Sequence, residues 1–142
     1  MKKLILPAII AALAILSACG TAADYTREGV TLAAVAGSAT DHSVSAVLEN
    51  TTAQQLCTGK ADDFGLEQLQ NGKWTELAPE TASGAADKSV CYIPGMPAQL
   101  DFDWTEKCGS LPAGHYRVVK RFFAGEGEKA EGFYLAAEFD IA

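Results

Sequence analysis

Four cysteines offer the most varied chemistry in this chain: Cys19, Cys57, Cys91 and Cys108. A thiol can carry an acyl chain, pair in a disulfide, bind zinc or act as a nucleophile, and its surroundings decide which of these it does. Cys19 follows directly on an apolar run near the N-terminus, whereas the other three are spread through a polar, glycine-punctuated sequence. Cys19 is thus in a different chemical setting from the others.

Residues 1–18 have the layout of an export signal. The basic stretch Met1-Lys2-Lys3 precedes an apolar run of 13 residues from Leu4 to Leu16, whereas a membrane-spanning helix needs about 20. The stretch Leu16 to Cys19 reads Leu-Ser-Ala-Cys and resembles the lipobox of bacterial lipoproteins. In that signal type the cysteine receives a diacylglycerol and the peptidase cuts just before it. We predict a signal-peptide helix over residues 1–18 and a mature chain that begins at lipidated Cys19.

This signal would place the protein at the cell membrane, with its folded part facing the extracellular side. Acyl chains contribute about 0.8 kcal/mol per buried CH₂, and two or more chains, such as a diacylglycerol with a palmitate, give stable anchoring. Residues 19–28 would be the lipidated terminus and tether, which spans roughly 15 to 18 Å as a flexible coil. The alternatives are an ordinary secretory signal, cut near Ala18 or Ala23, and a transmembrane anchor.

The predicted mature chain is strongly acidic. Loss of residues 1–18 removes two lysines and leaves nine basic against 18 acidic residues, a net charge of −9. This charge argues against nucleic acid as a partner, because phosphate binding needs Lys and Arg to release counterions. It also argues against electrostatic adhesion to anionic lipids, so the acyl group would supply the anchoring. The simplest role of such a charge is solubility.

The rest of the chain alternates between apolar and polar residues in short segments that glycine and proline separate. Such alternation predicts antiparallel strands with one buried face, most clearly in Phe133–Ile141. Strands are expected near 29–36, 42–50, 63–70, 73–78, 88–93, 98–104 and 115–123, with 132–141 as a closing eighth. Seven to eight strands indicate an all-β, immunoglobulin-like antiparallel sandwich, and Leu111–Tyr116 is typical of a tyrosine corner, in which Tyr116 bonds back to upstream backbone.

Asn71-Gly72 predicts a hairpin, because both residues tolerate the positive φ angles of a type I′ turn. A two-residue turn there pairs Leu69 with Trp74 and Leu66 with Leu77. These pairs fall on opposite faces of an ideal hairpin, so we expect a bulge between them. The mature chain shows no helical period of useful length.

Seven segments, in their order along the chain, resemble the bacterial immunoglobulin-like domain family of Gram-positive surface lipoproteins. They are Gly29-Val-Thr-Leu32, Leu48-Glu-Asn50, Phe64-Gly-Leu-Glu67, Asn71-Gly-Lys-Trp74, Asp103-Trp104, Gly109-Ser-Leu-Pro-Ala-Gly-His-Tyr-Arg-Val-Val-Lys120 and Tyr134-Leu-Ala-Ala-Glu-Phe139. The resemblance covers one domain, residues 29–142, and implies a β-sandwich, surface exposure and no catalytic residues. The chain departs from the family at Cys108, where relatives carry Tyr, and at Cys57, which replaces an aromatic residue.

Three cysteines besides Cys19 allow at most one internal pair. In such a sandwich the loops carrying Cys57 and Cys91 meet at one end. Cys108 then lies a strand length of about 17 to 20 Å away, too far for a disulfide, whose Cα atoms lie within about 7 Å. We expect a Cys57–Cys91 disulfide and a free Cys108, although an anaerobic host would leave all three as thiols. The wide spacing predicts no zinc site. Catalysis by Cys108 would need a histidine base, and both His115 and His42 are interpreted as solvated.

Other polar clusters have a structural and a functional interpretation. Asp101 and Asp103 on one strand face could hold Ca²⁺ or act as acid and base, but alternating Asp more often protects a sheet edge. Asp62-Asp63 and the acidic loop 125–131 are interpreted as solvated, with recognition by the loop as the alternative.

Two tryptophans bear on the choice of ligand. Trp104 shares one strand face with the apolar residues Leu100 and Phe102 and is expected in the core. Trp74 lies near the turn, and both core packing and sugar stacking remain possible for it. We predict a membrane-anchored lipoprotein that is not an enzyme, needs no cofactor, and binds an unknown protein or glycan. The alternative is an envelope enzyme or an enzyme regulator such as a protease inhibitor.

Overall fold

The computed structural model describes residues 25–79, 90–126 and 129–142. The predicted signal peptide, Cys19 and most of the predicted tether lie outside the described residues, as do the first two residues of the strand expected near 88–93.

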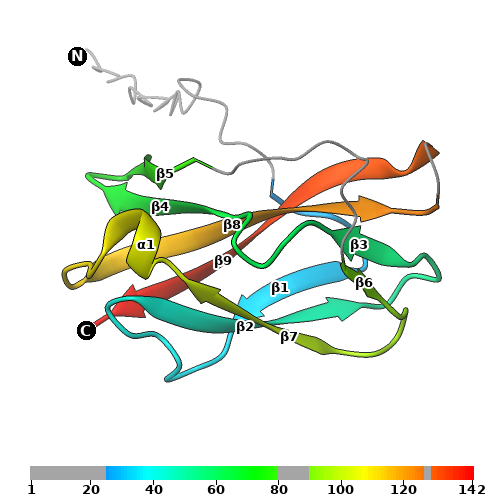
Figure 1. Ribbon diagram of the computed structural model, residues 1–142, viewed down its shortest axis with the longest axis horizontal. Coiled ribbons are helices and arrows are strands. Elements are labelled where there is room, and N and C mark those ends of the chain that lie inside the picture. The colour runs from blue at the N-terminus through cyan, green and yellow to red at the C-terminus, as the bar shows by residue number, and fades with distance from the viewer. Residues whose placement is uncertain (1–24, 80–89, 127–128) are drawn as a thin grey trace, which may run out of the picture.

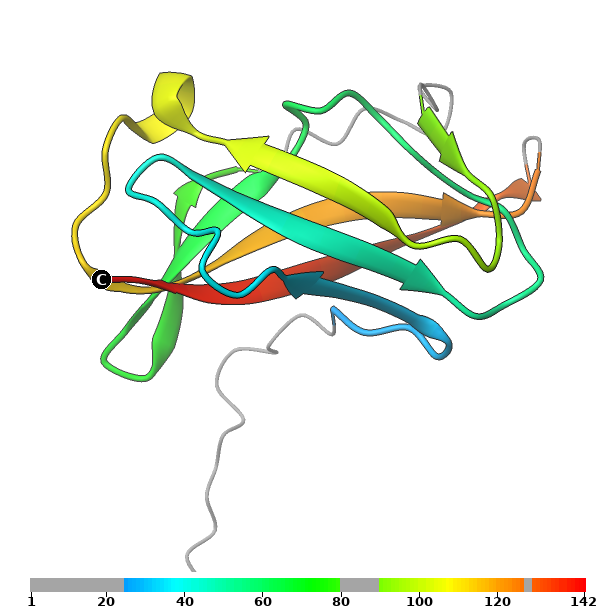
Figure 2. The same ribbon diagram turned by 90° about the horizontal axis from the view of Figure 1, so that it is seen from below.

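In the described residues, nine strands form a sandwich of two antiparallel sheets, which confirms the predicted fold class (Figure 1). The strands are β1 (Val30–Ala34), β2 (Ser43–Asn50), β3 (Leu56–Thr58), β4 (Gly65–Gln70), β5 (Lys73–Ala78), β6 (Val90–Tyr92), β7 (Ala98–Asp103), β8 (Gly114–Ala124) and β9 (Glu131–Ile141). The smaller sheet has the order β1-β2-β7 and lies in front in Figure 2. The larger sheet runs β5-β4-β8-β3-β6, with β9 also paired to β8.

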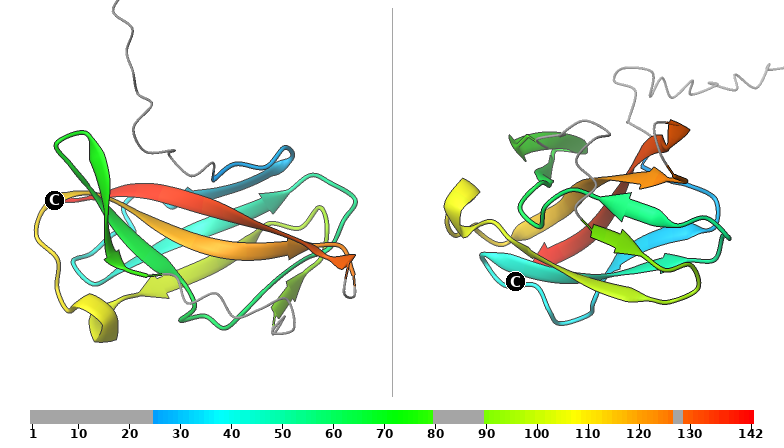
Figure 3. Two further views of the ribbon diagram at one scale, coloured as in Figure 1. Left: turned by 90° about the horizontal axis from the view of Figure 1, so that it is seen from above. Right: turned by 45° about the vertical axis from the view of Figure 1, so that its right-hand side comes forward.

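The long strand β8 organises the larger sheet (Figure 3, left). Along one side it pairs with β9 over its whole length, from Gly114 opposite Ile141 to Ala124 opposite Glu131. Its other side is shared, because residues 116–119 pair with β4 and residues 122–124 pair with β3. The buried ammonium group of Lys120 faces the gap between those two strands and donates to the carbonyl oxygens of Lys60 and Asp63, at 2.8 and 2.9 Å. The side chain thus holds the connecting loop where the sheet is interrupted.

Aromatic side chains fill the space between the sheets, where the inward-facing residues of the two sheets meet. Phe64 meets Phe102 edge to face with centroids 5.1 Å apart, and Phe139 stacks on Trp104 at 5.5 Å. The predicted core position of Trp104 is confirmed, since none of its surface is exposed, and its indole N–H donates to the carbonyl oxygen of Asp41 at 3.0 Å.

The hairpin between β4 and β5 has the predicted turn, with φ of 52° at Asn71 and 78° at Gly72. Leu69 lies opposite Trp74 as predicted, and a bulge separates Leu66 from Glu67. The bulge moves the register by one residue, so Leu66 pairs with Ala78, and the predicted pairing with Leu77 is wrong.

The tyrosine corner is present as predicted. Tyr116 is fully buried, and its hydroxyl group donates to the carbonyl oxygen of Pro112 at 2.7 Å. This bond ties the loop that enters β8 to the strand itself, in the manner typical of immunoglobulin-like sandwiches.

Two short elements were not expected from the sequence. Strand β3, Leu56–Thr58, is buried at every position, so it shows no alternation from which it could be predicted. Helix α1, Thr105–Cys108, is a single turn after β7, too short to leave a helical period in the sequence.

Candidate binding site

The outer face of the larger sheet carries a series of stacked aromatic and arginine side chains, here named the arginine–aromatic ladder. Its members are Tyr25, Trp74, Arg117, Arg121, Phe123 and Tyr134. Guanidinium-to-ring-centre distances are 4.1 Å from Arg117 to Trp74, 4.6 Å from Arg117 to Tyr25, and 4.9 Å from Arg121 to Phe123. These distances are within the range of cation–π attraction.

Arg117 is the inner member of the ladder, since its side chain is only 12 % exposed. Its guanidinium group donates from Nε and Nη2 to the Oε1 atom of Glu67, at 3.2 and 2.7 Å. The hydroxyl of Tyr25 also approaches Glu67, at 3.4 Å. Burial and the Glu67 charge raise the pKa of Tyr25, so the phenol stays neutral. Tyr25 is therefore fixed to the sheet through Arg117 and Glu67.

His115 extends the ladder toward the end of β9. Its ring lies 5.6 Å from that of Trp74, and its two nitrogens contact Glu138 and Asp140 at 2.8 and 2.7 Å. Hydrogen bonds to Glu138 and then Asp140 raise the pKa of His115. The sequence interpretation of a solvated loop residue is therefore incomplete. His115 belongs to β8, and strand pairing places both carboxylates beside it.

Arg121 is the ladder's arginine without a carboxylate partner in the described part of the chain. Its Nε atom is buried and has no hydrogen-bond partner there. The guanidinium lies over Gly132, where a Cβ atom would approach Nη2 to 2.8 Å and Nε to 3.0 Å. The missing side chain at Gly132 thus gives Arg121 its place between Phe123 and Tyr134.

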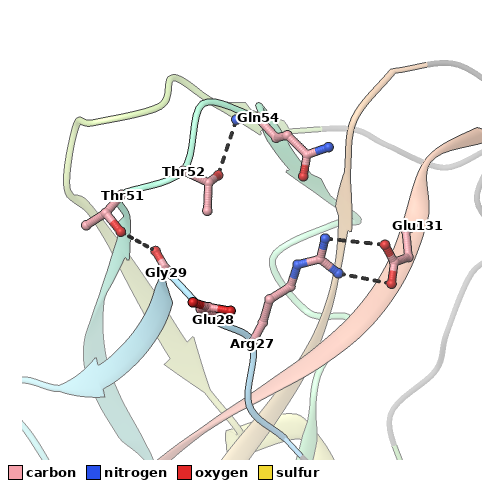
Figure 4. A pocket seen from close by; sticks show the side chains of 7 residues that line it. All are labelled: Arg27, Glu28, Gly29, Thr51, Thr52, Gln54 and Glu131. Atoms are coloured by element: carbon pink, nitrogen blue, oxygen red, sulfur yellow. Dashed lines mark hydrogen bonds and ion pairs between the residues drawn. The ribbon is translucent and has the colours of Figure 1, made fainter.

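A polar hollow of about 610 Å³ lies where β1 begins, beside the β2–β3 connection (Figure 4). On one side Arg27 pairs with Glu131, with Nη1–Oε1 and Nη2–Oε2 distances of 3.2 and 3.3 Å. On the other side Thr51 donates to the carbonyl oxygen of Gly29 at 3.0 Å.

Hydroxyl, amide and carboxylate groups of Glu28, Thr52 and Gln54 complete the lining. The hollow has no aromatic lining residue among those that the structure describes, so its chemistry suits a small polar molecule and offers little apolar area.

Comparison with known proteins agrees with the fold. Residues 27–140 match the family described as bacterial Ig-like domain. The chain belongs to this family. No match is found among curated proteins or among solved structures. In the described part of this Ig-like domain, no helix is long and apolar enough to cross a membrane.

The structure of the Ig-like domain brings Cys57 and Cys91 together in a disulfide and leaves Cys108 as a free thiol. The geometry differs from the one expected. Both cysteines lie on strands rather than in loops, and they face each other in the β3–β6 ladder with Cα atoms 4.0 Å apart. Burial raises the pKa of the Cys108 thiol, which lowers its reactivity. Cys19 lies outside the described residues.

The carboxylates singled out in the sequence lie apart from the ladder. Asp101 and Asp103 are exposed on β7, an edge strand of the smaller sheet. Hydrogen bonds from Ser45 and Gln99 lower the pKa of Asp101. His42, the other histidine, lies with its Nδ1 atom 2.8 Å from Oδ1 of Asp41. Within the described ranges, no group of three or more His, Cys, Asp or Glu residues is arranged to hold a metal ion.

Sequence reasoning singled out Trp74 and His115 but missed the arginines between them. A signal was available, because His115, Arg117 and Arg121 fall at odd-numbered positions of β8, whereas Tyr116, Val118 and Phe122 at even-numbered positions are buried. That alternation places Arg117 and Arg121 on one outward face. The contacts of these arginines with Tyr25 and Tyr134 could not be predicted without knowing which strands pair and where the N-terminal segment runs.

Proposed function

We propose that this protein is a lipid-anchored cell-surface module that acts by binding through its Ig-like domain. The sequence support for the anchor is the Leu-Ser-Ala-Cys19 motif behind a basic and apolar leader. The family match begins at residue 27, so the domain follows the anchor after a short tether. Domains of this kind are commonly found at the cell surface and are typically non-catalytic.

The observation that carries the binding function is the arginine–aromatic ladder. Trp, Tyr and Arg are the residues most enriched at the centres of binding interfaces. Here they share one sheet face and are held in place by stacking and by the Arg117–Glu67 ion pair. Pre-organised side chains lose less conformational freedom on binding than mobile ones, so this face is suited to recognition.

A catalytic role has less support. His115 is engaged by two carboxylates on its ring nitrogens, and the Cys108 thiol has a raised pKa. An enzyme or a protease inhibitor at the envelope is the alternative, and a hydrolytic or inhibitory activity of the purified protein that disappears in a His115→Gln variant would favour it.

The anchor is tested by labelling cells with a clickable palmitate analogue and comparing Cys19→Ser with Cys108→Ser. Both variants lose one thiol, so they are matched. We expect label and membrane association to be lost only in Cys19→Ser. Equal labelling of both variants, or a mature terminus elsewhere by mass spectrometry, would contradict the anchor.

The binding face is tested by a photo-crosslinking amino acid placed at Leu69, which lies beside Trp74 and is 37 % exposed. The control carries the same amino acid at exposed Gln99 on the smaller sheet. We expect adducts with lipid or protein from position 69 and few from position 99. Adducts from position 99 alone would show that the ladder is not the contact surface.

A further inference from the structure

We propose that the ladder face rests on the lipid headgroups of the membrane that holds Cys19, so that the domain lies on its larger sheet. This inference builds on the proposed lipid anchor and names the occupant of the same face. Four observations support it: the point where the tether ends, the kinds of side chain present, the balance of charge, and the contrast with the opposite sheet.

The tether ends on the ladder itself. Tyr25 is the first described residue. The centre of its ring lies 4.6 Å from the guanidinium carbon of Arg117 and 6.2 Å from the ring centre of Tyr134. The start of the described chain lies beside β9 in the left panel of Figure 3. Six residue steps separate Tyr25 from Cys19, which reach at most about 22 Å when fully extended. An acylated Cys19 therefore keeps the ladder close to the bilayer.

The side chains of this face are those that favour the membrane–water boundary. Tyr and Trp combine an apolar ring with a polar group and are enriched at headgroup level. Trp74 and Tyr134 are partly exposed, and Leu69 beside Trp74 adds exposed apolar surface. This combination allows the face to enter the headgroup layer with little loss of hydration for polar groups.

Part of the charge of the face is offset by contacts within it, although the mature chain is acidic and the exposed Glu76 also lies on this face, opposite Glu67. Glu67 is paired with Arg117, while Glu138 and Asp140 both contact His115. Arg121 has no such carboxylate in the described residues. Guanidinium groups bind phosphate through paired hydrogen bonds, so Arg121 is suited to a lipid phosphate.

The outer face of the smaller sheet has the opposite character. Apart from Val47, it presents small, polar or acidic side chains, and these are Thr31, Ala33, Ser43, Ser45, Glu49, Gln99, Asp101 and Asp103. Its exposed carboxylates would be repelled by anionic headgroups. The two faces therefore differ in their affinity for a membrane, and the ladder is the one that the tether reaches.

The two tryptophans allow a direct test with the full lipidated chain reconstituted in vesicles. The vesicles contain phosphatidylglycerol, phosphatidylethanolamine and a headgroup-nitroxide lipid, which quenches fluorescence at short range. Trp74 lies on the ladder, and Trp104 is buried in the core, so the Trp74→Phe variant gives the background from Trp104. The control variant combines Trp74→Phe with Gln99→Trp and reports on the opposite sheet.

We expect the nitroxide lipid to quench most of the Trp74 emission and little of the emission from position 99. Arg121→Gln should reduce the Trp74 quenching more than Lys129→Gln, which removes the same charge from an exposed position in the β8–β9 connection. Mass spectrometry of Cys19 separates the outcomes. An unmodified Cys19 overturns both the anchor and this inference. A lipidated Cys19 with no Trp74 quenching, equal quenching at both positions, or a Trp74 response only to added envelope protein overturns the orientation alone.

Discussion

The disulfide between Cys57 and Cys91 should be a major source of stability for this domain. The bond joins two strands of three residues each, β3 and β6, across a sequence separation of 34 residues. Closing a loop of that length in the unfolded chain contributes about 3.8 kcal/mol at 25 °C by the chain-entropy relation. A domain of this size changes its Tm by about 4 to 8 °C per kcal/mol. Reduction should therefore lower the Tm by roughly 15 °C or more.

Thermal unfolding followed by circular dichroism, with and without a phosphine reductant, measures this effect. The Cys57→Ala/Cys91→Ala variant should melt near the reduced wild-type protein and should not respond to reductant. Cys108→Ser is the matched control, and it should keep both the high Tm and the sensitivity. A shift of less than about 5 °C, near 1 kcal/mol, would refute the argument, as would peptide mapping that finds Cys108 in the bond.

Two further predictions concern β8. Tyr116→Phe removes the tyrosine-corner hydrogen bond and should lower the free energy of unfolding by about 1 to 1.5 kcal/mol; a urea midpoint equal to that of the wild type would contradict it. The raised pKa of His115 makes its contacts with Glu138 and Asp140 stabilising at low pH. That stability is fully present below the unfolded pKa of about 6.5 and is lost as pH rises through the folded pKa. NMR titration should find the His115 pKa above 6.5, and His115→Gln should remove this pH dependence; a lower pKa would show that the carboxylates do not hold the ring.

Much of the sandwich could be predicted because strands such as β2, β7 and β9 have one buried and one wet face. Residues 133 to 141 alternate regularly, and the structure buries Leu135, Ala137, Phe139 and Ile141. The Asn71-Gly72 turn was predictable for a local reason, since its φ angles depend on two residue types. Strand β3 lies between β6 and β8 and is buried on both faces, so period two could not reveal it.

The site was harder to predict because it depends on contacts between distant segments. Arg117 contacts Glu67, which is 50 residues away in the sequence, and His115 contacts Asp140, which is 25 residues away. Each contact requires the order of the strands and a register correct to one residue. The position of the Arg121 side chain depends on the absence of a side chain at Gly132 on the neighbouring strand β9. The sequence pattern of β8 alone does not indicate that requirement.

The disulfide across β3 and β6 also bears on when the domain folds. In a reducing cytoplasm the two thiols stay reduced, and the folded domain lacks the disulfide's contribution of about 3.8 kcal/mol to its free energy of unfolding. At about 1.4 kcal/mol per tenfold change, this loss shifts the folding equilibrium by nearly three orders of magnitude toward the unfolded chain. If the chain is exported as proposed, the reduced precursor would unfold more readily while it must still thread through a translocation pore. Oxidation on the far side would then add the missing stability to the folded domain.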